Sequence, residues 1–236
     1  MHQQNQTECI ILAGGLGTRL RSAVPDLPKC MAPIAGKPFL AYLIDYLLAQ
    51  QVTKFIFSLG YMHEAIEAFI KNNYPQLQYQ IALESEPLGT GGAIRLACDY
   101  ATEENVIVLN GDTMFRVEIQ SLLKYHTLQK SDCTLSLKTM HKFDRYGVVE
   151  TDADNNITSF KEKMQYESGN INGGVYALHV PSFKSILLPE KFSFEKDYLE
   201  KYFNQIKMVG YLVDGYFIDI GIPEDFEKAG RELGNI

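Results

Sequence analysis

The stretch ECIILAGGLGTRL, residues 8–20, decides the fold of this chain: an apolar run is followed by three glycines within four positions. The run predicts a buried strand, and glycines directly after a strand let the backbone approach a ligand, often a phosphate. The dinucleotide-binding fingerprint would need glycine at Leu20, and GKP at 36–38 lacks the ending of a P-loop. The loop therefore predicts either a phosphate site of another kind, with Arg19 pairing with a polyphosphate, or a plain strand-to-loop turn.

Strands and helices alternate outward from this stretch. The first strand is expected at 8–13, further apolar strands at 54–60, 77–84 and 105–112, and amphipathic helices at 38–51, 63–74 and 90–101. Strands that are separated by helices form parallel sheets with right-handed crossovers. The first half therefore predicts an α/β fold.

The second half changes character. Strands are expected at 133–140, 146–152, 156–163, 172–179 and 206–221, and helical segments near 194–204 and at 223–233. No repeat, low-complexity tract or linker separates the two halves. We therefore expect one domain over residues 8–233, in which the second half adds strands and a small lobe to the sheet of the first.

Composition excludes several classes of protein. The net charge of −7 leaves no basic footprint for nucleic acid, and no apolar run approaches the ~20 residues that span a membrane. The opening MHQQNQTE is polar and does not form a signal peptide. Four scattered cysteines without a C-x-x-C pair predict free thiols in a reducing compartment: Cys9, Cys30, Cys98 and Cys133. These features predict a cytoplasmic protein.

Glycine-rich and polar segments follow the predicted strands at one edge of the sheet. Open α/β sheets bind their ligands at this edge, where the carboxyl ends of the strands meet. Gly14 and Gly15 follow the first strand, ESEPLGTGGA at 84–93 follows the third, and Asp112 ends the fourth. Each segment alone is explained by turn chemistry, but three on one edge indicate a binding site.

Two acids and a lysine are candidates for chemistry at that site. Asp219 lies in the apolar run YFIDIGIP, where an acid needs a partner or a cation. Asp112 and Asp219 together suit one Mg²⁺, whose preferred ligands are hard oxygens. Lys29, in PKCMAP, is either a solvated surface charge or a point charge on phosphate. The same alternatives, surface or ligand, apply to Glu162, Lys163 and Asn172.

A second acidic motif is better explained as a turn. DAD at 152–154 matches the D-x-D metal motif of glycosyltransferases. It lies in TDADNN, a polar cluster between two predicted strands, which is typical of a hairpin turn.

Eight motifs, in order, are similar to those of the sugar-1-phosphate nucleotidyltransferases: LAGGLGTRL, PKCMAPIAGKP, EPLGTGGAI, LNGDT, RYGVVE, FKEK, NGGVY and DIGIPED. The resemblance runs from about residue 8 to about residue 230. It implies a three-layer, Rossmann-like α/β fold with a mostly parallel mixed sheet, a nucleotide-binding part at about 8–115 and a sugar-binding part at about 116–233. It also implies that a sugar 1-phosphate attacks the α-phosphorus of an NTP with the help of Mg²⁺, and that pyrophosphate leaves.

The resemblance implies roles for individual residues. Arg19, Lys29 and Lys163 are the catalytic residues, which bring positive charge to the phosphates, and Asp112 and Asp219 are the Mg²⁺ ligands. The nucleotide lies against Leu12, Ala13, Gly14, Gly15, Gly17, Thr18, Glu84, Pro87, Gly89, Thr90 and Gly111. The sugar lies against Gly147, Glu162, Asn172 and Gly173.

Base and sugar are expected from finer similarities. EPLGTGGAI, FDRYGVVE, KFSFEKDYL and GYFIDIGIPED are most similar to guanylyltransferases acting on heptose 1-phosphate, and next to those acting on mannose 1-phosphate. The expected partners are therefore GTP and a sugar 1-phosphate, with no nucleic acid or membrane, and a homo-oligomer stays open. A uridylyl- or thymidylyltransferase for another hexose 1-phosphate and a non-catalytic sugar-nucleotide-binding regulator are the alternatives.

Two residues carry open questions. Glu84 either reads guanine by accepting from N1–H and the 2-amino group or caps the turn that follows it. Cys30 stands where the family usually has the second proline of P-K-P. The loss of that proline frees a backbone φ and puts the rigidity of the Lys29 loop in question, while leaving the role of the charge unaffected.

Overall fold

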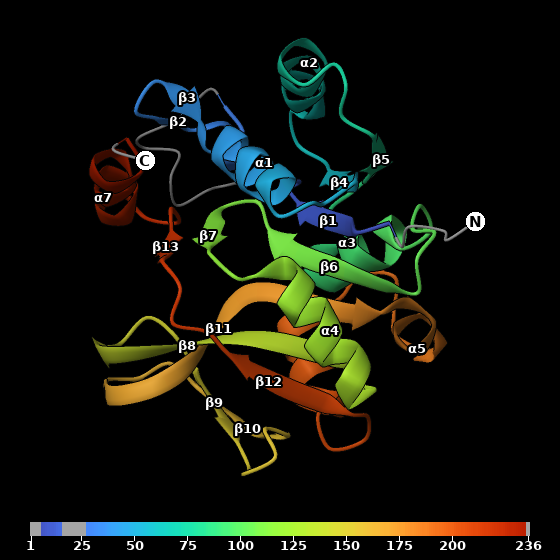
Figure 1. Cartoon of the computed structure of the whole chain (residues 1–236), viewed down its shortest axis with the longest axis vertical. Helices are drawn as coiled ribbons and strands as arrows, with labels where there is room; N and C mark the ends of the chain where they lie inside the picture. The colour runs from blue at the N-terminus through green and yellow to red at the C-terminus, as the bar shows by residue number, and fades with distance from the viewer. Residues whose placement is uncertain (1–5, 16–26, 235–236) are drawn as a thin grey trace.

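The structure, a computed structural model, describes residues 6–15 and 27–234. Its centre is a nine-stranded mixed sheet in the order β10-β9-β11-β6-β1-β4-β5, with β8 and β12 joined to it through β11 (Figure 1). Its strands are β1 Glu8–Leu12, β4 Lys54–Leu59, β5 Tyr79–Leu83, β6 Asn105–Asn110, β8 Cys133–Phe143, β9 Val148–Thr151, β10 Ile157–Lys161, β11 Tyr166–His179 and β12 Met208–Leu212. Two short ribbons pair β2 Pro33–Ile34 with β3 Lys37–Pro38, and β7 Thr113–Phe115 with β13 Phe217–Asp219.

Helices cover both faces of this sheet. They are α1 Phe39–Ala49, α2 His63–Asn73, α3 Gly89–Ala97, α4 Ile119–Gln129, α5 Val180–Ser185, α6 Glu200–Tyr202 and α7 Pro223–Leu233. A 3-10 turn spans Lys29–Met31 and a π-helical turn spans Phe194–Leu199. None of these helices has the length and apolarity needed to cross a membrane.

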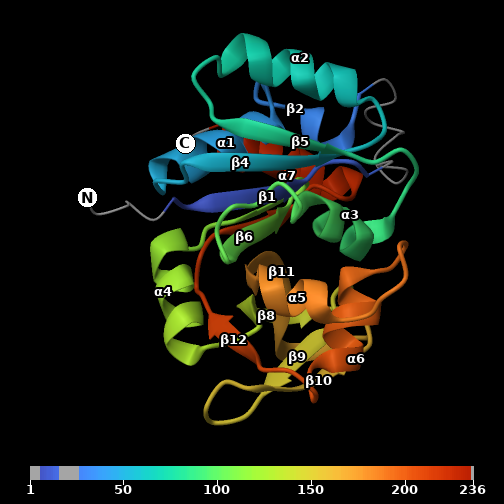
Figure 2. The same cartoon turned by 90° about the vertical axis from the view of Figure 1, so that its right-hand side faces the viewer.

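The first half folds as the sequence predicts, because β1, β4 and β6 are largely apolar on both faces and β5 completes the edge of the sheet. β1 lies parallel to β4 on one side and to β6 on the other, and β4 pairs in parallel with β5. Ile11 packs in the core beneath α1 and α2, whereas its neighbour Ile10 packs in the opposite core with Ile94 of α3. Figure 2 shows α2 above β4 and β5 and α3 below them. The expected three-layer α/β arrangement is confirmed.

The long strand β11 joins the two halves. Val175–His179 of β11 pairs antiparallel with β6, and its earlier residues pair antiparallel with β8. β8 in turn pairs in parallel with β12. The strand expected at 172–179 therefore begins earlier, because pairing with β8 extends it to Tyr166.

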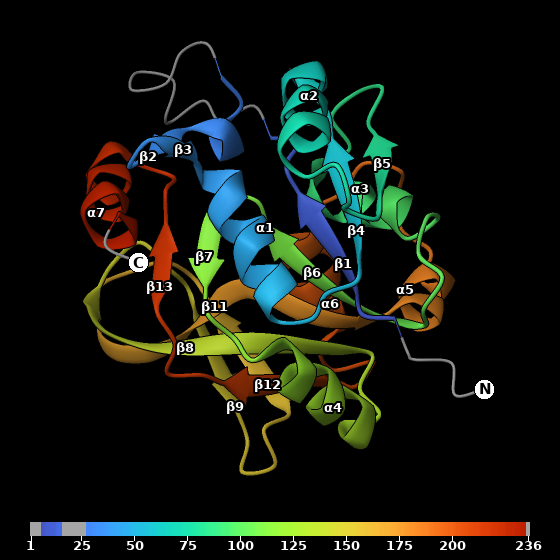
Figure 3. The same ribbon diagram turned by 45° about the horizontal axis from the view of Figure 1, so that its top comes forward.

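The strand expected over 206–221 is wrong as one element. It divides into β12 and β13, which pair with different partners, β8 and β7. Between them Gly215 lies so close to the backbone carbonyl of Arg116 that a Cβ there would collide with it. The chain leaves the large sheet at this point and crosses to β7, and Figure 3 shows β13 beside β7 and α7.

Helix α4 was not expected from the sequence. Its buried positions are Ile119, Leu122 and His126, so one of three is polar and lowers the apolar contrast between its faces. No side chain caps its first turn. Two minor expectations hold: Asp152 accepts backbone hydrogen bonds from Asp154 and Asn156 in a turn between β9 and β10, and all four cysteines are free and buried.

His126 is held as a neutral ring on the buried face of α4. The residue is 1% exposed. Its Nε2 lies 3.1 Å from Asn105 Oδ1, which can only accept, so the ring proton is assigned to Nε2. Nδ1 lies 2.8 Å from Thr134 Oγ1 and 2.9 Å from Ser131 Oγ and accepts from one of these two hydroxyls. One neutral tautomer satisfies this arrangement, whereas the imidazolium would turn the acceptor into a second donor. Burial lowers the pKa of His126 to about 4.

Folding stability is therefore expected to decline as the pH falls through this range. An unfolded histidine titrates near pH ~6.5, so the stabilisation is complete above that pH and is lost as the pH falls toward about 4. Across this window the free energy of unfolding of the wild type should fall by up to about 3 kcal/mol more than that of His126→Gln. Urea unfolding at several pH values measures this, with the exposed His141→Gln as control. Parallel declines in wild type and His126→Gln would contradict it.

Candidate active site

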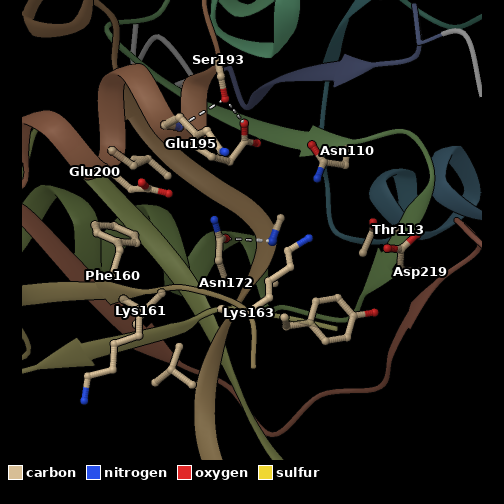
Figure 4. A pocket seen from close by; sticks show the side chains of 18 of the residues that line it. Asn110, Thr113, Phe160, Lys161, Lys163, Asn172, Ser193, Glu195, Glu200 and Asp219 are labelled. Atoms are coloured by element: carbon tan, nitrogen blue, oxygen red, sulfur yellow. Dashed lines mark hydrogen bonds between the residues drawn. The ribbon is translucent and has the colours of Figure 1, made fainter. Parts of the chain in front are cut away.

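Two cavities open along the edge where the parallel strands end. The first, of about 780 Å³, lies over the ends of β1, β4 and β5 and the start of α3. The second, of about 650 Å³, lies between β11, the β10 end and the turn that begins at Ser193 (Figure 4). Both cavities are lined by Asn110, Asp112 and Glu195. A molecule in each cavity would therefore meet the other beside Asp112.

Lys29 and two aspartates form an ionic cluster at this junction. Lys29 Nζ contacts Asp112 Oδ2 directly and lies 3.7 Å from Asp219 Oδ1. The Lys29 side chain is 12% exposed, whereas those of Asp112 and Asp219 are 36% and 29% exposed. Both carboxylates face the second cavity. The structure thus brings Asp112 and Asp219, the predicted metal ligands, to one ammonium group.

The β7–β13 ribbon brings the two aspartates together. Asp219 pairs with Thr113, the neighbour of Asp112, and the N–H of Ile220 donates to the carbonyl of Asp112 at 3.0 Å. The N–H of Gly221 donates to Asp219 Oδ1 at 2.7 Å. Asp219 is thus the last residue of the short strand β13, and its carboxylate points toward Lys29 and Asp112.

The turn at Lys29–Met31 forms without the usual proline. The N–H groups of Met31 and Ala32 donate to the carbonyls of Pro28 and Lys29, at 2.8 and 3.1 Å, and form a 3-10 turn. Cys30 is buried in the core at its centre. Backbone hydrogen bonds and the buried thiol hold the turn where proline would have restricted it.

Glu84 has one carboxylate oxygen in a capping hydrogen bond and the other at the first cavity, so its position is compatible with both roles that the sequence left open. Its Oε2 accepts the N–H of Leu88 at 2.9 Å, so it does cap the turn that follows. Its Oε1 lies against the backbone of Gly14 in the first cavity, with Ser58 Oγ at 3.5 Å. Burial raises the pKa of Glu84. One carboxylate oxygen is structural and the other remains available to a ligand.

Replacing Gly14 by alanine is expected to destabilise the fold. A Cβ at this position would lie 2.6 Å from Glu84 Oε1 and 2.9 Å from the backbone nitrogen of Gly60, and backbone cannot move aside cheaply. We expect Gly14→Ala to lower the free energy of unfolding by about 1–3 kcal/mol. The control is Gly230→Ala in α7, where a Cβ would meet no described atom within 4 Å apart from the backbone of its own helix, so the change should be neutral or stabilising. Equal effects of both substitutions in urea unfolding would contradict the prediction.

The second glycine-rich turn is shaped chiefly by packing. A Cβ on Gly91 would collide with the ring of Phe192, and one on Gly89 would lie 2.6 Å from the Phe192 carbonyl oxygen. The N–H of Gly91 donates to that carbonyl at 3.0 Å, and the N–H of Phe192 donates to Leu88 at 3.0 Å. These glycines let the chain around Phe192 pack onto the start of α3. Of this turn, Pro87, Gly89 and Thr90 also line the first cavity.

Glu195, which sequence reasoning missed, is fixed where the cavities meet. Its Oε2 accepts from Thr90 Oγ1 at 2.7 Å and from Ser193 Oγ at 3.0 Å. Thr90 Oγ1 in turn accepts the N–H of Phe194 at 2.8 Å. The Thr90 hydroxyl, expected to bind nucleotide, thus joins α3 to the Phe194 turn. The motif KFSFEKDYL was noted for its similarity alone, and nothing local in it pointed to Glu195.

The second cavity contains the residues expected to bind the sugar. Gly147, Glu162, Lys163, Asn172 and Gly173 all line it. Lys163 extends into the cavity, whereas Lys161 turns away and pairs with Glu150 (Figure 4). The Asn172 side chain donates to the Tyr176 hydroxyl at 2.9 Å and accepts the N–H of Gly174 at 3.1 Å, so it also holds the irregular part of β11.

Five of the residues predicted to contact the nucleotide or its phosphates are not among the described residues that line a cavity. Gly17, Thr18 and Arg19 fall outside the described residues. Ala13 and Gly111 line neither cavity; their N–H groups donate to the carbonyls of Ser58 and Leu12, at 2.9 Å each. Leu12, Gly14, Gly15 and Glu84, which are predicted to contact the nucleotide, line the first cavity.

The aspartate pair has the chemistry to hold a divalent cation. Within residues 6–15 and 27–234 no group of three or more His, Cys, Asp or Glu side chains is placed to hold a metal ion. Asp112 and Asp219 nonetheless converge on one cation, the Lys29 ammonium, and remain open to the second cavity. Two carboxylates with substrate phosphates and water form a common Mg²⁺ site, so the residues fit this ion.

Comparisons with known proteins agree on one family. A model of the nucleotidyl transferase family matches residues 8–235. The chain is 52% identical over 226 residues to D-glycero-alpha-D-manno-heptose 1-phosphate guanylyltransferase of Aneurinibacillus thermoaerophilus, covering 96% of this chain and 98% of that one. The enzyme of the same name from Campylobacter jejuni is 42% identical, covering 93% and 96%. The crystal structure of HddC from Yersinia pseudotuberculosis complexed with GMP-PN superposes with a TM-score of 0.87 at 38% identity, covering 97% and 100%.

Proposed function

The chain belongs to the nucleotidyl transferase family, and from that premise we propose that it transfers a guanylyl group from GTP to D-glycero-α-D-manno-heptose 1-phosphate. A phosphate oxygen of the sugar attacks the α-phosphorus of GTP, the bond to the β-phosphate oxygen breaks, and GDP-heptose and pyrophosphate result. The guanylyl and heptose assignments rest on the two relatives of that name, which align with nearly the whole chain.

The observation that carries the proposal is the meeting of the two cavities at one ionic cluster. GTP takes the first cavity, with its base toward Glu84, and the sugar 1-phosphate takes the second. The reacting phosphates then lie beside Asp112, where an α-phosphorus and a sugar phosphate can be held in line. Holding two reactants in this geometry supplies much of the rate enhancement in such a reaction.

The roles of the charged residues follow from this placement. Lys29 brings positive charge to the reacting phosphates, Lys163 binds the phosphate of the sugar, and Arg19 binds the pyrophosphate. Asp112 and Asp219 would hold Mg²⁺, which when bound neutralises negative charge on the phosphate oxygens. Glu162 and Asn172 bind sugar hydroxyls. Glu195 keeps the turn that begins at Ser193 in place against Thr90.

Pyrophosphate release tests the proposal. The purified protein is incubated with Mg²⁺, with GTP, UTP or dTTP, and with either D-glycero-α-D-manno-heptose 1-phosphate or mannose 1-phosphate. Strong, Mg²⁺-dependent release with the heptose and weak release with mannose is the expected result. Release only with mannose 1-phosphate would show that mannose 1-phosphate, and not the heptose, is the sugar substrate. Release only with UTP or dTTP would show that the nucleotide substrate is not GTP. No release with any NTP and sugar 1-phosphate would favour a non-catalytic regulator.

A further inference from the structure

The second cavity has an end to which the proposed reaction assigns no group. Figure 4 shows Thr113 and Asp219 at one end, Lys163 and Asn172 between, and Glu200 and Phe160 at the other. Five carboxylates line this cavity: Asp112, Glu162, Glu195, Glu200 and Asp219. Glu200 is the one without a role so far. In the described part of the chain its side chain makes no hydrogen bond or ion pair, so its oxygens remain free to accept.

The proposed reaction fixes which way the sugar points. Its phosphate must lie at the junction with the first cavity, beside Asp112, because the α-phosphorus of GTP is attacked there. The rest of the sugar therefore extends past Asn172 toward the far end of the cavity. That end is walled by Phe160 of β10, by Lys196 and Leu199 of the π-helical turn and by Glu200 of α6.

The environment of Glu200 suits a polyhydroxyl ligand. Glu200 lies solvent-exposed at the mouth of this end of the cavity. Partial burial raises the pKa of Glu200, and the negative charge of Glu162 raises it further, whereas Lys196 lowers it. Glu162 and Glu200 come from different elements and are close enough to affect each other. Two carboxylates can accept hydrogen bonds from several hydroxyls, while the neighbouring ammonium of Lys196 donates to another.

We propose that Glu200, with Glu162, binds the exocyclic diol of the heptose and so distinguishes heptose 1-phosphate from mannose 1-phosphate. The two sugars share the manno ring, and the heptose adds one hydroxymethyl group to the arm on the ring. This arm carries two neighbouring hydroxyls, and one carboxylate can accept a hydrogen bond from each of them. The inference deepens the proposed function and rests on it.

Sugar preference in Glu200 variants tests this inference. We expect Glu200→Ala to lower kcat/KM for heptose 1-phosphate by about 10- to 100-fold, the effect of losing hydrogen bonds to a charged group. The kcat/KM for mannose 1-phosphate and the KM for GTP should change by less than about 2-fold, a negligible difference in binding free energy. Glu200→Gln, which keeps an acceptor, should lie between wild type and Glu200→Ala. Glu167→Gln, an exposed carboxylate on β11 outside both cavities, is the matched control.

The outcomes separate this inference from the proposed function. A wild type that prefers the heptose, with the same preference kept in Glu200→Ala, would overturn the role of Glu200 and leave the proposed function intact. Equal losses with both sugars would also overturn it, because they would place Glu200 on the shared ring or in the fold. A wild type that uses both sugars equally would refute the heptose assignment and this inference together. Melting temperatures of all variants identify any loss caused by unfolding.

Discussion

Replacing Lys29 by methionine is expected to lower kcat/KM for guanylyl transfer by about 10²- to 10³-fold, the usual cost of removing one electrostatic donor from an active site. Methionine keeps much of the stem but removes the only charge that contacts Asp112 within the described residues. Negative charge on the reacting phosphates would then face two carboxylates without this ammonium between them. Pyrophosphate release under steady-state conditions measures the effect.

The control for Lys29→Met separates the active-site charge from surface charge. Lys184 pairs with Asp99 on the surface, where both side chains are about half exposed. Lys184→Met should therefore leave kcat/KM within about 2-fold of the wild type, because exposed ion pairs contribute little. A loss of less than about 5-fold in Lys29→Met would contradict the role given to Lys29. Equal melting temperatures would confirm that the comparison concerns folded enzymes.

Replacing Glu8 by alanine is expected to be the most damaging of these changes for folding. Glu8 is fully buried and accepts from Lys54 Nζ at 2.8 Å and from the N–H groups of Thr102 and Glu103 at 2.8 and 3.0 Å. Its carboxylate thus ties the start of β1 to β4 and to the loop before β6. Removing it leaves the N–H groups of Thr102 and Glu103 without their acceptor. It also removes the counter-charge of Lys54, which is only 14% exposed and keeps a hydrogen bond to the Tyr100 carbonyl. Together these losses should cost about 3 kcal/mol of unfolding free energy.

Acid should remove the same stabilisation in the wild type. Burial raises the pKa of Glu8, but the hydrogen bonds from Lys54, Thr102 and Glu103 outweigh it and hold the pKa below its usual value. The contribution is therefore complete above the pKa of an unfolded glutamate, ~4.3, and is lost as the pH falls through the lower folded value. Urea unfolding at neutral pH measures the substitution. Asp99→Asn, at an exposed ion pair, is the control and should cost less than about 1 kcal/mol.

The sequence predicted well those features that depend on residues close together in the chain. The strands β1, β4 and β6 are short, mostly apolar runs between polar turns, and apolar residues on both faces together with the helices between them made a parallel sheet the expected arrangement. The edge at which Gly14 and Asp112 lie follows from the direction of those strands. Asp219 could be suspected because a carboxylate inside an apolar run needs a partner wherever the run folds.

Features that depend on distant parts of the chain could not be predicted in this way. Helix α4 was missed because His126 occupies a buried position that only its partners Asn105, Ser131 and Thr134 make favourable. The glycines of the second turn suggested phosphate binding, but Gly91 is shaped mainly by the ring of Phe192, which approaches from the other half of the chain.

The chemical groups of the active site were thus contained in the local sequence, whereas their arrangement was decided by tertiary packing. Apolar runs and turn residues set strands, helices and strand ends through interactions over a few residues, so the α/β sheet and the edge that binds ligands were predictable. The β7–β13 ribbon places Asp112 and Asp219 beside Lys29. Strand β11 and the turn that packs on α3 place Glu195 and Glu200 around the second cavity. Side chains from three regions of the chain become neighbours only when those strands pair. No local sequence pattern encodes which strand edges will meet, so this arrangement could not be predicted from the sequence.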